Sequence, residues 1–293
     1  MSVDGPDDRA RVLVIGLGTM GLPIALRLQA ASVRVWGMDS RADVHDALPG
    51  PDARVVTSGS VCDAVHASRA ATVITCVSNE AALQQLWQAP GGLREALVPG
   101  LCVIDHTTTA IPTARQLAAD VAQAGAMWVD APLSGAPAGA RAGTLSAMLG
   151  GDHGAVERAR TVLSAYCATI THLGAAGAGQ AGKLTNQIAI AGINAGLLAA
   201  TGFAALQGLD LSRCFDALAA GSAHSVQMDQ HRAALTRAPA DSAPFDWLRR
   251  DLALALAHTP ADEPATSHAS LALLDRLSAL NRVFNGTAAS PLL

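Results

Sequence analysis

A lysine and two amides spaced to share one helical turn are the part of this sequence best suited to acid–base chemistry. Lys183 is the only lysine in the chain, and it follows a glycine-rich stretch. If Lys183 opens a helix, Asn186 and Gln187 lie on the same face, three and four residues later. The helix dipole and partial burial would both lower the lysine pKa towards a useful acid–base range. The pattern predicts a proton donor beside two substrate-binding amides, and a solvated lysine in a first helical turn is the alternative.

A glycine pattern near the N-terminus is suited to holding the phosphates of a dinucleotide. The apolar run 12–15 is followed at once by Gly16-Leu17-Gly18-Thr19-Met20-Gly21, and a helical pattern begins at residue 22. In such a strand–turn–helix, the first glycine permits a tight turn, the second lets backbone approach a pyrophosphate, and the third lets the helix pack closely. The phosphates then lie on free N–H groups at the helix N-terminus. We expect residues 16–21 to bind a dinucleotide cofactor, and a glycine turn in an ordinary parallel-sheet protein is the alternative.

An acidic residue follows at the distance expected for contact with the adenosine ribose. Asp39 stands at the end of a second apolar run, 33–36, and is followed by Ser40. A carboxylate there can accept hydrogen bonds from the ribose diol and repel a 2′-phosphate, which favours NAD over NADP. Arg41 follows one residue later and could still turn towards a phosphate. A surface aspartate without a ligand is the alternative.

The elements that must position these residues fall into two groups. Strand-like runs alternate with helical segments such as 113–124 and 155–166, which predicts a mostly parallel, doubly wound sheet with helices on both faces. The expected strands are 12–15, 33–36, 71–77, 101–104, 127–129, 145–149 and 170–173. Beyond the glycine-rich stretch 174–182 the pattern is helical, with expected helices at about 180–207, 209–221, 226–235, 243–258 and 271–284. We expect a loose leader at 1–9, a dinucleotide-binding domain at 10–174 and a helical domain for substrate binding and oligomerisation at 175–293.

The composition excludes several other classes of protein. Half of the residues are hydrophobic and the net charge is −4, so a large core is possible and a nucleic-acid footprint is not indicated. The five cysteines form no C-x-x-C pair and the nine histidines show no metal-ligand spacing, which favours free thiols in a reducing compartment and no metal site. The longest apolar stretch, 188–206, is interrupted by glycines, so we expect a buried helix rather than a membrane span. The acidic N-terminus does not read as a signal peptide, and we expect a cytoplasmic protein.

Three further motifs complete an ordered set. They are Asp105-His-Thr-Thr-Thr109, the stretch 130–151 that begins Asp-Ala-Pro-Leu-Ser-Gly, and the stretch 177–187 that contains Lys183. With the glycine pattern, they make residues 11–258 resemble the β-hydroxyacid dehydrogenase family, which includes 3-hydroxyisobutyrate dehydrogenase, tartronate semialdehyde reductase and L-threonate dehydrogenase. The resemblance implies an α/β Rossmann-type domain, a long interdomain helix and an all-α C-terminal domain that assembles homodimers or homotetramers. It also implies reversible hydride transfer between a nicotinamide and a small β-hydroxy acid, giving a semialdehyde or keto acid.

The resemblance also assigns roles to particular residues. Lys183 matches the catalytic lysine, and Asn186 with Gln187 matches a substrate-binding pair. The loop Ser134-Gly135-Ala136 matches the loop that binds the substrate carboxylate, except that Ala136 replaces a usual glycine. The expected cofactor contacts outside the glycine turn are Asp39, Ser40, Val77, Ser78, Thr108 and Arg250.

Departures from the family pattern leave the substrate open. Cys76-Val77-Ser78 stands where Met-Leu-Pro is common, and Arg250-Asp251-Leu252 stands where Lys-Asp-Leu is common. Arginine keeps the charge of lysine and changes its reach and geometry. We therefore predict an NAD-dependent dehydrogenase of a small β-hydroxy acid. An NADPH-dependent imine reductase and a non-catalytic dinucleotide-binding relative are the alternatives, and retention of Lys183 disfavours both.

Overall fold

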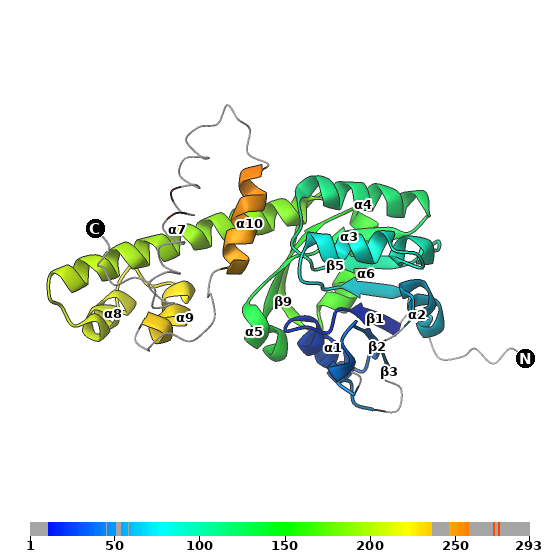
Figure 1. Ribbon diagram of the computed structural model, residues 1–293, viewed down its shortest axis with the longest axis horizontal. Helices are drawn as coiled ribbons and strands as arrows, with labels where there is room; N and C mark the ends of the chain where they lie inside the picture. The colour runs from blue at the N-terminus through cyan, green and yellow to red at the C-terminus, as the bar shows by residue number, and fades with distance from the viewer. Residues whose placement is uncertain are drawn as a thin grey trace, which may run out of the picture. The chain divides into compact units, whose positions relative to one another are not determined.

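The computed structural model describes residues 11–44, 46–50, 54–57, 59–235 and 246–257, together with Ala272 and Asp275. The chain divides into two compact units, residues 1–183 and 184–293 (Figure 1). The first unit thus ends at Lys183, whereas the sequence placed the division after residue 174. The expected leader 1–9 lies outside the described residues, as does the expected helix 271–284 apart from two of its positions.

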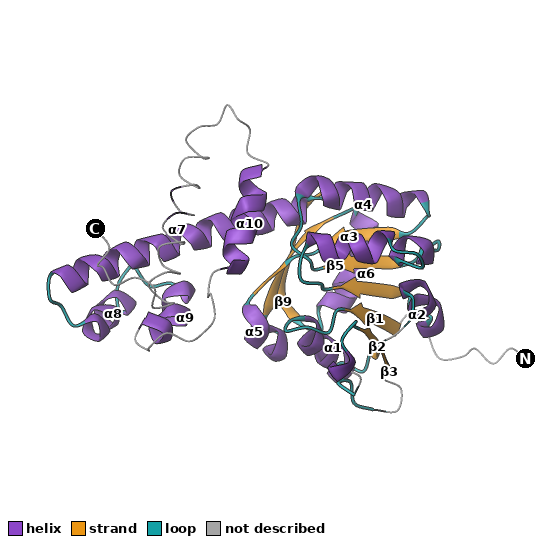
Figure 2. Ribbon diagram, viewed as in Figure 1, coloured by secondary structure: helices purple, strands orange, loops and turns teal. Residues whose placement is uncertain are grey.

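The first unit is built on a nine-stranded sheet in the order β3-β2-β1-β4-β5-β6-β8-β7, with β9 paired to β8. Neighbouring strands from β3 to β6 run parallel, β8 is antiparallel to β6 and β7, and β9 is parallel to β8. The predicted mostly parallel sheet is confirmed (Figure 2). The strands are β1 (Arg11–Ile15), β2 (Arg34–Met38), β3 (Arg54–Val56), β4 (Thr72–Thr75), β5 (Cys102–Asp105), β6 (Met127–Asp130), β7 (Leu133–Ser134), β8 (Leu145–Gly150) and β9 (Cys167–Gly174).

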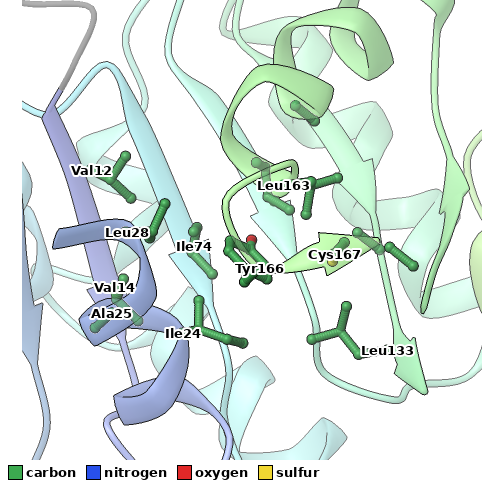
Figure 3. Close-up of a cluster of buried hydrophobic side chains, with 14 of the residues drawn as sticks. Val12, Val14, Ile24, Ala25, Leu28, Ile74, Leu133, Leu163, Tyr166 and Cys167 are labelled. Atoms are coloured by element: carbon green, nitrogen blue, oxygen red, sulfur yellow. The ribbon is translucent and has the colours of Figure 1, made fainter. Parts of the chain in front are cut away.

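Helices cover both faces of this sheet because successive side chains of a strand point to opposite sides. On β1, Val12 and Val14 join one buried cluster with side chains of α1, α5 and α6 (Figure 3). Leu13 and Ile15 join a second cluster with side chains of α2, α3 and α4. The helices are α1 (Gly21–Ala30), α2 (Val61–Ser68), α3 (Glu80–Gln88), α4 (Ile111–Gln123), α5 (Ala136–Ala142) and α6 (His153–Leu163), with short 3-10 helices at Ala42–Val44 and Leu93–Ala96.

Two strands were absent from the sequence prediction because neither carries a readable pattern. Strand β3 has three residues, of which only Val55 is buried. Strand β7 has two residues and directly follows a proline. Period-two alternation needs about four residues to be recognised. Short strands of this kind are stabilised by their neighbours in the sheet rather than by local sequence.

The described part of the chain beyond residue 174 is helical. Helix α7 (Ala178–Leu206) runs from the first unit into the second, where α8 (Leu211–Ala219), α9 (Val226–Leu235) and α10 (Asp246–Ala257) follow. Leu197, Phe215 and Met228 form a small core in the second unit. Among the described residues, α7 is long and apolar enough to cross a membrane, and 24% of its most apolar window is buried. The expectation that this stretch is mostly buried is therefore wrong for the single chain.

The expectation that Lys183 opens a helix is also wrong. Helix α7 begins at Ala178, which puts Lys183 in its second turn. The earlier start has a tertiary cause, because the carboxylate of Asp130 accepts hydrogen bonds from the backbone N–H groups of Gly177 and Gln180. The field of a helix dipole falls off within the first turn. The dipole argument for lowering the Lys183 pKa therefore loses its basis.

Candidate active site

The glycine turn joins β1 to α1 at the point where the strand order reverses, between β1 and β4. Gly16 has φ +93°, and a Cβ there would lie 2.3 Å from the carbonyl oxygen of Cys76. A Cβ on Gly21 would lie 1.8 Å from the carbonyl oxygen of Gly16. Both positions therefore require glycine, as the roles expected for them demand. Open α/β sheets bind ligands beyond the carboxyl ends of their strands at such a reversal.

The remaining residues of the turn fit a dinucleotide. No heavy atom lies within 4 Å of a Cβ built on Gly18, so open space lies in front of its backbone. Thr19 is exposed and Met20 is half-buried. Leu17 differs, because its side chain is buried and its N–H already donates to Asp39. A pyrophosphate would therefore be held by Gly18, Thr19 and Met20 at the start of α1, while Leu17 serves to position Asp39.

Asp39 forms a compact ion pair just after β2. Its Oδ2 accepts from the Leu17 N–H at 2.7 Å, and its Oδ1 accepts from Arg41 Nε at 3.1 Å. Arg41 Nη2 also donates to the carbonyl oxygen of Leu17 at 3.0 Å. Burial raises the pKa of Asp39, but the bonds from Arg41 and Leu17 outweigh it and hold the pKa below its usual value. The carboxylate is therefore ionised, and Arg41 partly neutralises its charge. The sequence indicated Arg41 only as a residue that could turn towards a phosphate.

The carboxyl ends of β4 and β5 bring further expected cofactor residues to the same edge of the sheet. Val77 follows β4, and its N–H donates to Thr107 Oγ1 at 3.3 Å. Ser78 is exposed next to Val77, and Thr108 is half-buried next to Thr107. Ser40 is exposed after Asp39. The structure thus gathers these positions near the glycine turn, since parallel strands end at a common edge.

The loop expected to bind a carboxylate lies between β7 and α5. Gly135 has φ +127° and Ala136 has φ +57°. The left-handed region costs a residue with a Cβ roughly 1–2 kcal/mol. The replacement of the usual glycine by Ala136 therefore falls on a position where glycine is favoured. Ser134 is half-buried on β7 and pairs with Ser146 of β8.

Lys183 reaches the start of this loop. Its Nζ donates to the carbonyl oxygen of Leu133 at 2.9 Å, and the side chain is half-buried. Leu133 directly precedes Ser134, so the only lysine of the chain is held beside the candidate carboxylate loop within the first unit. This contact joins two motifs that lie 50 residues apart.

The two amides belong to the second unit and differ in their surroundings. Gln187 is fully buried, and its Nε2 donates to Asp251 Oδ2 at 2.5 Å. Asn186 is half-buried and donates from Nδ2 to Gln187 Oε1 at 3.2 Å. Gln187 therefore ties α7 to α10 and orients Asn186, a function that sequence reasoning missed. Arg250, expected as a cofactor contact, is exposed on α10.

Buried polar residues lie at the ends of β5 and β6. They belong to the motifs recognised in the sequence, which predicted no role for them. Burial raises the pKa of Asp105 to about 7 and that of Asp130 to about 6. Burial lowers the pKa of His106 to about 4, so this histidine is neutral. His106 Nδ1–H donates to the carbonyl oxygen of Ala131 at 2.6 Å, and Nε2 accepts from the Tyr166 hydroxyl at 2.9 Å. His106 therefore fastens the sheet to the loop before β9, and the signal for it was a polar residue that ends an apolar strand.

Comparison with known proteins agrees with the geometry. Residues 11–174 match the family model of the NAD binding domain of 6-phosphogluconate dehydrogenase. Residues 177–279 match the model described as NAD-binding of NADP-dependent 3-hydroxyisobutyrate dehydrogenase. The two models together extend over both units of the chain.

Individual relatives cover nearly the whole chain. An NAD-dependent L-serine dehydrogenase from Pseudomonas aeruginosa is 31% identical, over 90% of each chain. The structure of Mycobacterium tuberculosis 3-hydroxyisobutyrate dehydrogenase with L-serine has a TM-score of 0.74 at 27% identity and covers 94% of each chain. The structure of Psf3 in complex with NADP+ and 2-OPP has a TM-score of 0.79 at 29% identity and covers 93% of this chain and 94% of its own. The chain therefore belongs to the β-hydroxyacid dehydrogenase family of NAD(P)-dependent oxidoreductases.

Proposed function

We propose that this protein is an NAD-preferring dehydrogenase of a small β-hydroxy acid, with Lys183 as the general acid and base. The observation that carries the proposal is the bond from Lys183 Nζ to the carbonyl oxygen of Leu133, beside the Ser134 loop. In that position a proton-transfer group and a candidate carboxylate site lie within one small region. Members of one family with the same fold can differ in substrate, because the substrate class depends on the residues of the site.

The residues then have distinct tasks. A nicotinamide cofactor, when bound, would supply the hydride acceptor or donor. In oxidation, the neutral amine of Lys183 takes the proton of the substrate hydroxyl as the carbon–hydrogen bond breaks. In reduction, the ammonium group returns that proton to the carbonyl oxygen. Ser134 and the Gly135 backbone hold the substrate carboxylate, and the Leu133 carbonyl directs the amine by accepting one of its hydrogen bonds.

The substrate class is tested by a panel. L-serine and 3-hydroxyisobutyrate, which relatives are named for, head a series of small hydroxy acids assayed by nicotinamide absorbance with both cofactors. We expect turnover with at least one β-hydroxy acid and none when the carboxylate is replaced by an uncharged amide. Turnover of cyclic imines in place of hydroxy acids would favour the imine reductase alternative. Cofactor binding without turnover of hydroxy acids or cyclic imines would favour the alternative of a non-catalytic dinucleotide-binding protein.

The cofactor preference follows from Asp39 and its partner. We expect NADH to bind more tightly than NADPH, because Asp39 repels a 2′-phosphate and can accept bonds from the ribose. Asp39→Ala should weaken NADH and improve NADPH, and Arg41→Ala should weaken NADPH more than NADH because it leaves the carboxylate uncompensated. Each change should be about 1–3 kcal/mol, or roughly five- to a hundred-fold in affinity. Fluorescence titration with both reduced cofactors measures the affinities of the wild type and of each variant.

The control for these variants is Arg213→Ala, which removes an exposed arginine from α8 in the second unit. It should leave both affinities unchanged. If the native protein binds NADPH more tightly than NADH, the role given to Asp39 is wrong. In that case, loss of NADPH affinity in Arg41→Ala would assign the phosphate to Arg41.

We propose a homodimer or homotetramer, because α7 leaves large apolar side chains exposed. Phe203 is 64% exposed and Leu206 is 61% exposed. An apolar helical face requires cover, and a second copy of the chain would supply it without a membrane.

Light scattering should give two or four times the monomer mass of 29.7 kDa. Phe203→Glu should lower that mass, whereas Val98→Glu, which changes an exposed residue of the first unit, should not. A wild-type monomer at micromolar concentration would contradict the proposal.

A further inference from the structure

The start of α7 is held by a carboxylate from a distant strand. Asp130, the last residue of β6, is fully buried. Its Oδ1 accepts from the Gly177 N–H at 2.8 Å, and its Oδ2 accepts from the Gln180 N–H at 3.0 Å. The first N–H groups of a helix have no partner within the helix. Asp130 supplies that partner and so decides where α7 begins.

Gln180 connects the same helical turn to the loop after β5. Its side chain is fully buried. Oε1 accepts from the Thr109 N–H at 3.1 Å, and Nε2 donates to the carbonyl oxygen of Thr107 at 2.8 Å. Thr108, which is one of the expected cofactor contacts, lies between these two residues. Lys183 follows Gln180 by three residues, which is about one helical turn.

Close packing brings the first turns of α7 directly against the neighbouring strands of the sheet. A Cβ on Gly179 would lie 2.4 Å from the carbonyl oxygen of Asp130, and a Cβ on Gly150 would lie 2.6 Å from Asp130 Oδ1. A Cβ on Gly182 would lie 2.2 Å from Leu173 Cδ1. The helix backbone therefore rests directly on the sheet on either side of Gln180. Any change in the bonds of Asp130 or Gln180 must be absorbed by movement of the helix that carries Lys183.

Stability alone does not explain this arrangement. Burial of a carboxylate is costly, and burial raises the pKa of Asp130 to about 6 despite four backbone bonds. Apolar residues of similar volume often stabilise a protein as well as buried charged groups do. What the polar pair provides is a fixed geometry between the helix, β6 and the loop after β5. Such geometry matters for catalysis, because a displacement of about 1 Å can cost about a hundredfold in rate.

We propose that Asp130 and Gln180 are positioning residues that fix the Lys183 amine relative to Thr108 on the cofactor side of the site. The inference rests on the proposed role of Lys183 and adds two residues that neither touch the substrate nor transfer a proton. Asp130 sets the start of α7, and Gln180 sets the spacing between α7 and the Thr107–Thr109 backbone. Together they hold the proton-transfer group where hydride transfer occurs.

Two near-isosteric variants test the proposal. Asp130→Asn replaces one acceptor oxygen by a donor that faces a backbone N–H group. Gln180→Glu removes the donor to the Thr107 carbonyl and keeps the shape of the side chain. Each should lower kcat between about tenfold and a hundredfold with little change in KM. Because the two substitutions break different contacts, either variant that folds decides the question.

The single lysine offers a readout that needs no cofactor. Protein labelled with carbon-13 at the lysine Cε gives one Cε signal from the whole chain, that of Lys183. We expect this signal to move or broaden in both variants of the cofactor-free protein. The control is Ser60→Ala, which removes the side-chain cap of α2 in the same unit. It should lower the stability of the protein and change neither the lysine signal nor kcat.

The outcomes separate this inference from the proposed function. If Lys183→Ala is inactive while Asp130→Asn and Gln180→Glu keep the wild-type kcat and lysine signal, the positioning role is overturned and the catalytic role stands. If Lys183→Ala remains active, the proposed function fails, whatever the other variants do. If Ser60→Ala lowers kcat as much as the two variants do, the loss reflects general destabilisation and the inference is overturned.

Discussion

Lys183→Ala should lower kcat by about 10²–10⁴-fold and leave the NADH affinity nearly unchanged. The reason is that the variant removes the proton-transfer group and no part of the glycine turn that holds the cofactor. The Leu133 carbonyl loses its bond from Nζ, and this contact lies outside the glycine turn. Steady-state kinetics with the best substrate of the panel and a fluorescence titration with NADH measure the two effects.

A second substitution separates charge from proton transfer at this site. Lys183→Arg keeps a positive charge, but a guanidinium has too high a pKa to release its proton at neutral pH. We therefore expect Lys183→Arg to be nearly as inactive as Lys183→Ala. Retention of more than about a tenth of the wild-type kcat in Lys183→Ala would remove this residue from the mechanism.

Alanine at Gly18 and at Gly21 should have opposite effects on folding and binding. At Gly21 the new Cβ would lie 1.8 Å from the carbonyl oxygen of Gly16, so the helix must leave the strand. We expect Gly21→Ala to lose about 3 kcal/mol or more of stability. At Gly18 a Cβ meets no atom within 4 Å, so Gly18→Ala should fold normally. Its Cβ should instead occupy the place of the pyrophosphate and weaken NADH binding about ten- to a hundred-fold.

Thermal unfolding by circular dichroism and NADH titration distinguish the two variants. Gly154→Ala is the matched control, because Gly154 lies exposed in α6 with no atom within 4 Å of a Cβ. It should bind NADH normally and gain up to about 1 kcal/mol from helix propensity. If Gly18→Ala binds NADH as the wild type does, the phosphates do not lie against this turn.

The sheet could be predicted from the sequence because most of its strands are marked by local patterns of apolar residues. Apolar runs ending in glycine or in polar residues mark β1, β4, β5 and β6, and the alternation of strands with helices leaves few other topologies. The glycine pattern likewise predicted the turn. Backbone atoms lie so close to Gly16 and Gly21 that a Cβ at either position would clash with them. Short elements escaped prediction, because β3 and β7 have two or three residues and depend on neighbouring strands.

The candidate site shows what only the tertiary structure decided. Sequence alone identified Lys183 but placed it at a helix start, because the carboxylate that begins α7 comes from Asp130, 47 residues away from Gly177. It identified Gln187 by its spacing from Lys183, and only the structure shows that Asp251, 64 residues further along the chain, accepts a bond from its amide. Residue types and spacing thus determined which groups could do chemistry. Long-range hydrogen bonds decided where those groups lie, since a buried polar atom takes its partner from whichever segment the fold brings near it.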